Sequence, residues 1–120
     1  MKPDLKLKWI ENLESGKFIQ GRTYLNTENI NGNRYCCLGV LAETAIETGL
    51  PITKERYGDE WKYGISPYEV NRFTLTSSLA HDLGIQDQSC DLLVELNDVH
   101  EQNFTSIAEW IRDNIDEDPQ

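Results

Sequence analysis

The sequence is organised around one apolar segment, Cys36 to Thr48. Its apolar residues recur every three or four positions, the spacing of a buried helix face: Leu38, Leu41, Ala42, Ala45 and Ile46. The next residues are Gly49-Leu50-Pro51, where Gly can cap a helix and Pro prevents it from continuing. The pattern predicts a buried helix that ends near Thr48, around which the rest of the chain must pack.

One glycine interrupts this predicted helix. Gly39 should lower helix stability by about 1 kcal/mol relative to alanine. A glycine inside a helix often marks a place where something packs closely against it. We therefore expect another stretch of backbone to lie directly against the helix at Gly39.

The N-terminal part predicts a helix followed by a hairpin. Leu5 to Leu13 has amphipathic spacing, with a start signal before it and a glycine stop after it. Thr23 to Leu25 and Arg34 to Cys36 flank an Asn31-Gly32 pair, which favours the positive φ angles of a tight turn. By contrast, Ile52 to Phe73 shows no clean period and is interpreted as a long, partly ordered loop.

The C-terminal part predicts more helix. Thr76 to Leu83 forms a short helix that Gly84 closes, and the apolar run Asp91 to Leu96 favours helix over strand. The last helix has Asn103 or Thr105 as its cap and is followed by a frayed tail over residues 116–120. Its apolar face consists of Phe104, Ile107, Ala108, Ile111 and Ile115.

Together these elements predict an α+β fold over residues 1–120 as a single domain. The order is an N-terminal helix, a β-hairpin, and then a small helical bundle packed on the central helix Cys36 to Thr48. This central helix and the C-terminal helix carry the longest apolar faces, so we expect them to pack against each other.

Charge and N-terminal composition bear on partners and location. The formal charge is -10, which opposes direct nucleic-acid binding because the phosphate backbone is also negative. The first residues lack the uninterrupted apolar core of a signal peptide or a membrane span, so we expect a cytoplasmic protein with no membrane partner. Three cysteines form an odd set without a disulfide pattern, so reduced thiols are expected.

The adjacent cysteines, Cys36 and Cys37, are the first candidate site. A thiol at a helix N-terminus is favoured as thiolate, and a nucleophile would also need a base and an orienting group. The candidates for these two roles are His81, His100, Asn97 and Asp98. The alternative is structural: Cys37 would be a small buried hydrophobe, and Asp98 would accept hydrogen bonds from backbone amides at the start of the central helix.

No cofactor or metal is expected. The possible ligands have no metal-binding spacing, and phosphate-binding glycine motifs are absent. These possible ligands are Cys36, Cys37, Cys90, His81 and His100.

A second candidate site joins cationic donors to aromatic faces along the hairpin and the 52–73 segment. Such pairs suit an anionic aromatic ligand or a protein interface; the alternative is a solvated loop whose aromatic rings turn into the core. The predicted binding residues are Arg22, Arg34, Arg56, Tyr57, Trp61, Tyr63 and Arg72.

Three stretches resemble a family of short uncharacterised proteins of bacteriophages and their bacterial hosts: KWIENLESGKFIQG, RYCCLGVLAETA and LNDVHEQNFTSIAEWI. The specific parts are the run from Cys36 to Leu41 and the Leu96-Asn97-Asp98 step before a Phe-x-x-Ile-Ala helix. The resemblance implies a phage-type accessory protein in the host cytoplasm that is dispensable for virion assembly. It implies no particular activity.

The favoured function is stoichiometric binding. The protein would sequester a small anionic or aromatic ligand or block a host protein, an anti-defence role included. One alternative is a thiol-dependent enzyme built on Cys36 or Cys37, and another is an acidic mimic of nucleic acid.

Overall fold

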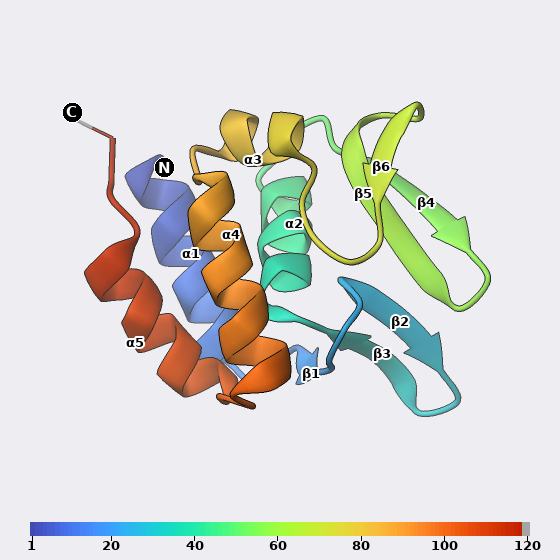
Figure 1. Cartoon of the computed structure of the whole chain (residues 1–120), viewed down its shortest axis with the longest axis horizontal. Helices are drawn as coiled ribbons and strands as arrows, with labels where there is room; N and C mark the ends of the chain where they lie inside the picture. The colour runs from blue at the N-terminus through green and yellow to red at the C-terminus, as the bar shows by residue number, and fades with distance from the viewer. Residues whose placement is uncertain (119–120) are drawn as a thin grey trace.

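The computed structural model describes residues 1–118 and has an α+β architecture, with helices on one side and a mixed sheet on the other (Figure 1). The elements in chain order are α1 (Pro3–Glu14), β1 (Ile19–Gln20), β2 (Asn26–Asn29), β3 (Gly32–Tyr35), α2 (Cys37–Glu47), β4 (Thr53–Tyr57), β5 (Glu60–Ser66), β6 (Glu69–Asn71), α3 (Ser77–Leu83), α4 (Asp87–Val94), the π-helical turn η1 (Glu95–Val99) and α5 (Phe104–Asn114). In this part of the chain, no helix has both the length and the apolar character that crossing a bilayer requires.

The central helix α2 is buried along most of its length, as its sequence predicts. Gly39 allows the backbone at Leu25 to pass directly against α2. A Cβ atom at Gly39 would lie 1.7 Å from the backbone oxygen of Leu25, so only glycine fits there. The predicted close approach of another backbone is therefore confirmed, and it joins α2 to the segment that leads into β2.

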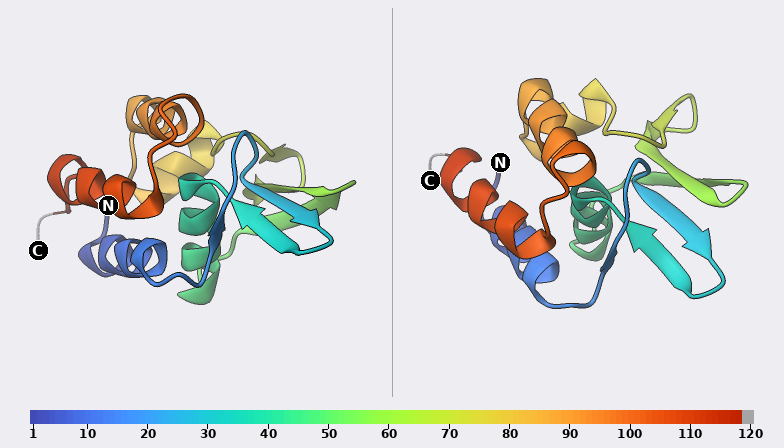
Figure 2. Two further views of the ribbon diagram at one scale, coloured as in Figure 1. Left: turned by 90° about the horizontal axis from the view of Figure 1, so that it is seen from below. Right: turned by 60° about the horizontal axis from the view of Figure 1, so that its bottom comes forward.

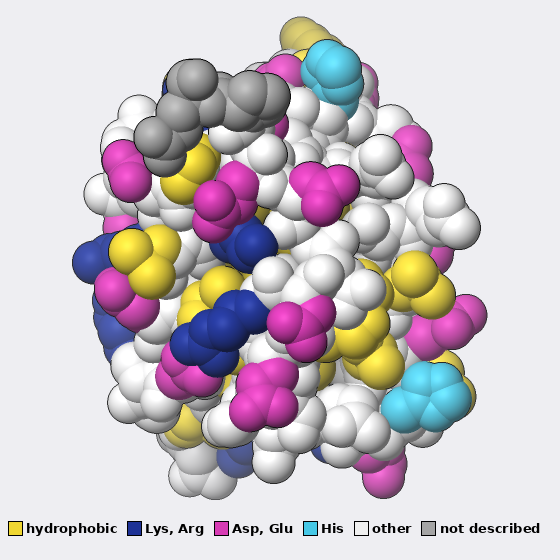
Figure 3. Space-filling model, turned by 90° about the vertical axis from the view of Figure 1, so that its left-hand side faces the viewer, with side chains coloured by type: hydrophobic (Ala, Val, Ile, Leu, Met, Phe, Trp, Pro, Cys, Tyr) yellow, Lys and Arg dark blue, Asp and Glu magenta, His cyan; other side chains and the backbone are white. Residues whose placement is uncertain are grey.

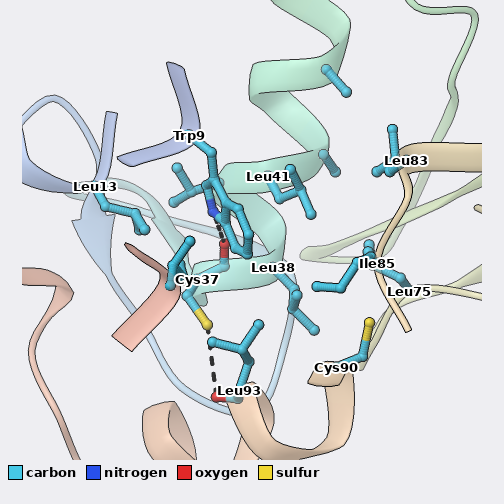
Figure 4. Close-up of a cluster of buried hydrophobic side chains, with 14 of the residues drawn as sticks. Trp9, Leu13, Cys37, Leu38, Leu41, Leu75, Leu83, Ile85, Cys90 and Leu93 are labelled. Carbon is cyan, nitrogen blue, oxygen red and sulfur yellow. Dashed lines mark hydrogen bonds between the residues drawn. The ribbon is translucent and has the colours of Figure 1, made fainter. Parts of the chain in front are cut away.

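The helices enclose one apolar core around the start of α2 (Figure 4). The indole N–H of Trp9 in α1 donates a hydrogen bond to the backbone oxygen of Cys37 at 3.0 Å, and the Cys37 thiol donates to the Leu93 oxygen in α4 at 3.7 Å. Cys37 is fully buried, so the prediction that it acts as a small core residue is confirmed.

The prediction that the central helix α2 and the C-terminal helix α5 pack against each other does not describe the main contacts of either helix. The main neighbour of α5 is α1, and α2 packs against α1 and α4 instead. The physical reason is that α1 is buried on two sides, with apolar residues such as Leu5 and Ile10 and with Lys6, whose ammonium donates to the Arg112 oxygen at 3.2 Å. The helix α1 thus packs against the apolar faces of both α2 and α5.

The predicted caps and the C-terminal segment can be placed. The Thr76 hydroxyl accepts from Leu79 N–H and the Asn103 side chain accepts from Ser106 N–H, so α3 and α5 begin as predicted. Asp91 to Leu96 is helical, divided between α4 and η1. Of the predicted frayed tail, Asp118 N–H donates to the Met1 oxygen at 2.8 Å, and residues 119–120 lie outside the described residues.

The interpretation of residues 52–73 as a loop is wrong. They form β4, β5 and β6, which join the β2–β3 hairpin in a sheet of order β1-β3-β2-β5-β4, with β6 also paired to β5. The sequence predicts a hairpin at β2–β3, but its first strand is Asn26–Asn29 and not Thr23 to Leu25. All pairs are antiparallel except β1 with β3. The strand pattern is hidden because both faces carry large polar or aromatic residues, so there is no alternation of apolar and polar positions. Figure 2 shows the β2–β3 and β4–β5 hairpins projecting away from the helices.

Candidate functional site

The sheet separates the predicted binding residues onto two faces. Directly opposite residues of an antiparallel pair lie on the same face. Lys54 pairs with Tyr63 and Arg56 with Trp61, and the Tyr63 hydroxyl reaches Glu43 of α2, so these side chains form the inner face. The outer face is the opposite one.

One row of residues crosses the outer face. Arg34 lies opposite Thr27, Thr27 opposite Glu60, and Glu60 opposite Tyr57. Arg72 follows β6 and makes an ion pair with Glu60 at 3.4 Å. Three predicted residues, Arg34, Tyr57 and Arg72, therefore share the outer face.

We call the residues Arg34, Tyr57, Lys62, Arg72 and Phe73 the outer patch. The Lys62 ammonium lies 4.1 Å from the centre of the Tyr57 ring, and the Arg72 guanidinium lies 5.4 Å from Tyr57 and 4.9 Å from Phe73. Tyr57 is 58% exposed and Phe73 is 43% exposed. All of these except Arg34 line a shallow hollow of about 230 Å³. The patch thus places Lys62 and Arg72 against aromatic rings at the surface, with Arg34 further along the same face.

The charge of the outer patch is only partly neutralised. Arg72 is paired with Glu60, but within residues 1–118 neither Lys62 nor Arg34 has a carboxylate at ion-pair distance. These two cations are therefore free to meet an external anion. Lys62 lies within the stretch Lys54 to Arg72 that the sequence favours for binding, although it is not among the seven residues singled out, and Phe73 lies just outside that stretch. Recognising a hairpin at Gly58-Asp59 would have placed Lys62 beside Tyr57.

The inner face contains the other predicted sheet residues, of which Tyr63 and Trp61 pack while Arg56 stays exposed. Tyr63 is fully buried, donates to Glu43 at 2.6 Å and accepts from Asn26 at 2.9 Å. Burial, followed by the nearby Glu43 charge, raises the pKa of Tyr63. Arg56 makes an ion pair with Glu28 at 2.8 Å, and Trp61 is mostly covered. Tyr63 thus belongs to the core and not to an exposed surface.

The cysteine pair lacks the environment of a nucleophile. Cys36 and Cys37 are both buried, and burial raises the pKa of Cys36 to about 12 and that of Cys37 well above its ordinary value. Cys36 Sγ instead caps α2 by accepting from Gly39 N–H at 3.4 Å. Among the described residues, no hydrogen bond joins a thiol to His81 or His100, and no three His, Cys, Asp or Glu residues gather around a possible metal position.

Asn97, not Asp98, binds the start of α2. Asn97 is fully buried in η1; its Oδ1 accepts from Cys37 N–H at 3.3 Å and from the Gln20 amide at 2.9 Å, and its Nδ2 donates to the Gly21 oxygen at 2.9 Å. Asp98 accepts instead from Thr23 N–H at 2.9 Å. The role expected of Asp98, accepting a backbone N–H at the start of α2, therefore belongs to the preceding residue, Asn97, because η1 turns that side chain inward.

Arg22 belongs to this same junction. Its guanidinium donates to the Asn97 oxygen and lies 3.9 Å from a Glu101 carboxylate oxygen. Thr23 and Glu101, which flank these contacts, have positive φ angles of 75° and 52°. Arg22 therefore contacts the Asn97 junction and is separate from the outer patch.

Comparison with known proteins places the chain in a family whose function is unknown. No curated protein and no solved structure matches the chain. One family model matches residues 1–115, which is nearly the whole described structure and includes both the outer patch and the Asn97 junction. The chain therefore belongs to the family described as a domain of unknown function, DUF8296.

Proposed function

We propose that this chain is a phage-type accessory protein that acts by stoichiometric binding, and that it holds an acidic segment of a partner protein on its outer patch. The observation that carries the proposal is the exposure of Tyr57 and Phe73 beside Lys62, with Arg34 further along the same face of the sheet. Neither of these two cations has an ion-pair partner within residues 1–118. Unpaired cations can donate charge-assisted hydrogen bonds to carboxylates.

The size of the hollow favours a protein over a small molecule. A volume of about 230 Å³ accommodates one or two side chains. Pockets that enclose small molecules span roughly 300 to 1,000 Å³. Tyrosine and arginine also supply much of the binding energy at protein interfaces. An acidic side chain inserted between Tyr57 and Phe73 would use both the rings and the cations.

The alternative functions gain less support. A thiol-dependent enzyme needs an accessible thiolate, whereas Cys36 and Cys37 are buried with raised pKa values. A nucleic-acid mimic needs carboxylates aligned along one face. On the helical side of the molecule the acidic side chains are instead scattered among basic and apolar ones (Figure 3).

The proposal is tested by an NMR titration with a short acidic peptide of Glu, Asp and Tyr. We expect saturable shifts at Tyr57, Lys62 and Phe73 that disappear in the double variant Arg34→Ala, Lys62→Ala. The matched control is Lys2→Ala, Lys8→Ala, which also removes two cations without an ion-pair partner within residues 1–118 but lies on the helical side.

Two outcomes would contradict the proposal. Equal binding by the two double variants would mean that the outer patch is not the contact surface. Saturable shifts at the patch with a nucleoside monophosphate, together with none for the peptide, would replace the protein partner with a small anionic ligand.

A further inference from the structure

An apolar groove lies away from the outer patch, where α1 begins and α2 ends beside α3 (upper edge in Figure 1). It consists of two adjoining hollows of about 420 Å³ and 230 Å³. The two hollows share three lining residues, Leu50, Asp82 and Leu83. We call these three residues, which lie at the junction of the hollows, the waist. The groove is therefore elongated, with room for more than one side chain.

The walls of the groove are apolar but incompletely covered. Pro3 and Leu5 line the larger hollow, and Ile52, Ile65 and Leu79 line the smaller one. Leu50 at the waist is 39% exposed and Ile65 is 40% exposed. Since apolar area is stabilised by removal from water, this surface favours contact with apolar side chains.

The rim of the groove favours a cation. Asp82 at the waist and Asp4 at the larger hollow are exposed, and neither has an ion-pair partner within residues 1–118. Thr48 places the C-terminal end of α2 at the same hollow, and the helix dipole is negative at that end. Among the described residues that line the groove, Lys2 is the one opposing charge, so the rim is acidic on balance.

We propose that this groove binds an apolar, basic peptide segment of a partner protein, in which a Lys or Arg lies between two apolar side chains. The apolar side chains occupy the two hollows, and the cation meets Asp82 at the waist. The charge pattern is opposite to that of the outer patch, so the two surfaces select different partner segments. The groove proposal thus stands independently of the proposed function.

The experiment uses a phage-displayed random peptide library as the probe. Selection on the whole chain should enrich peptides with a Lys or Arg flanked by Leu, Ile, Val or Phe. A synthetic peptide made from the selected sequence should shift the NMR signals of Leu50, Ile65 and Leu83, and those of Tyr57 should not change.

Charge reversal then tests the waist. Asp82→Lys should weaken the selected peptide by roughly tenfold or more, which corresponds to about 1.4 kcal/mol. Glu109→Lys makes the same charge change on the exposed side of α5 and should leave binding unchanged. A peptide in which the selected Lys or Arg is replaced by Glu should bind Asp82→Lys more tightly than the parent protein.

A second variant guards against misfolding. Leu50→Glu places a charge at a partly exposed position, so circular dichroism should be unchanged while peptide binding is lost. The proposal is overturned if selection enriches acidic peptides or none at all, if the NMR shifts lie outside the groove, or if Asp82→Lys and Glu109→Lys bind equally.

Discussion

The helical half of the molecule (α1 to α5) and the sheet half (β1 to β6 and the segment 72–74 that follows β6) differ in how completely their buried polar groups are hydrogen-bonded. In the helical half, Asn12 donates to Thr44 at 2.9 Å, and Asn97 uses both ends of its amide. In the sheet half, the Trp61 indole nitrogen and the Thr74 hydroxyl are buried without a partner among the described residues. Unpaired buried polar groups lower stability, because they lose their bonds to water.

The difference indicates where the molecule gains its stability. In the helical half, α2, α4 and α5 each contribute fully buried aliphatic side chains, including Leu41, Leu93 and Ile111. The sheet half instead exposes Tyr57, Tyr68 and Phe73. We infer that the helical half supports the fold, whereas the projecting sheet presents side chains for binding.

The strongest test of this difference is a matched pair of aliphatic truncations. Leu41→Ala in α2 should lower the free energy of unfolding by about 2 to 5 kcal/mol, the usual cost of deleting a buried aliphatic side chain. Ile65→Ala in β5 should cost less than about 1 kcal/mol, because the side chain is already 40% exposed. Urea denaturation measures both values, and equal losses would contradict the proposed division.

Alkaline pH provides a second test, because the buried thiols lie in the helical half. A thiol with a raised folded pKa stabilises the protein fully below its unfolded pKa of about 8.5. Above that pH the unfolded state loses its proton first, so stability falls until the folded pKa is reached. For Cys36, this window extends to about pH 12. Urea denaturation at successive pH values should show a loss of up to about 1.4 kcal/mol per pH unit for each such thiol.

Cys36→Ser is the matched control for the alkaline loss. Serine can accept the Gly39 N–H as an N-cap but does not titrate in this range. The variant should therefore lose stability less steeply between pH 9 and 12 than the parent protein. In the native parent, a chromogenic disulfide reagent should label the cysteines only as fast as the protein unfolds; rapid labelling of Cys36 or Cys37 would revive the enzyme hypothesis.

The two halves also differ in how far the sequence predicts them. The helices follow from apolar spacing and caps, because one face of each is buried and the other is solvated; Thr76 and Asn103 act as predicted. In β5, Trp61 and Lys62 lie on opposite faces, yet both are partly covered, so the sequence shows no two-residue period. The strands therefore could not be recognised from alternation.

The candidate sites were only partly predictable for a related reason. Arg34, Tyr57 and Arg72 were identified by residue type, but their separation from Arg56 and Tyr63 depends on strand register. Which side chain accepts a hydrogen bond from the start of α2 depends on the π-helical turn η1, in which Asn97 and not Asp98 points inward. No local sequence signal for this turn was recognised.

Asn97 joins the halves and gives the third test. Asn97→Ala should cost about 1 to 3 kcal/mol, because Cys37 N–H and the Gly21 oxygen lose a buried partner. Hydrogen exchange should then become faster in β1 and in the first turn of α2 together. Asn29→Ala is the control: it removes only an exposed turn hydrogen bond from Asn31 N–H, so it should cost less stability than Asn97→Ala and leave exchange in α2 unchanged. Faster exchange in only one of these elements would show that Asn97 does not couple them.

At the outer patch the effect on stability should be smaller than that of Leu41→Ala, whereas the effect on binding should be largest. Tyr57→Ala removes a ring that is 58% exposed and contacts the Lys62 and Arg72 cations. Exposed cation–π pairs contribute about 0.5 to 1 kcal/mol each, so thermal unfolding should shift by only a few degrees. If Tyr57→Ala instead lowered stability as much as Leu41→Ala, the ring would be needed to fold the sheet. Its exposure would then be no argument for a binding surface. A near-native melting temperature combined with loss of acidic-peptide binding in the NMR titration would separate these two explanations.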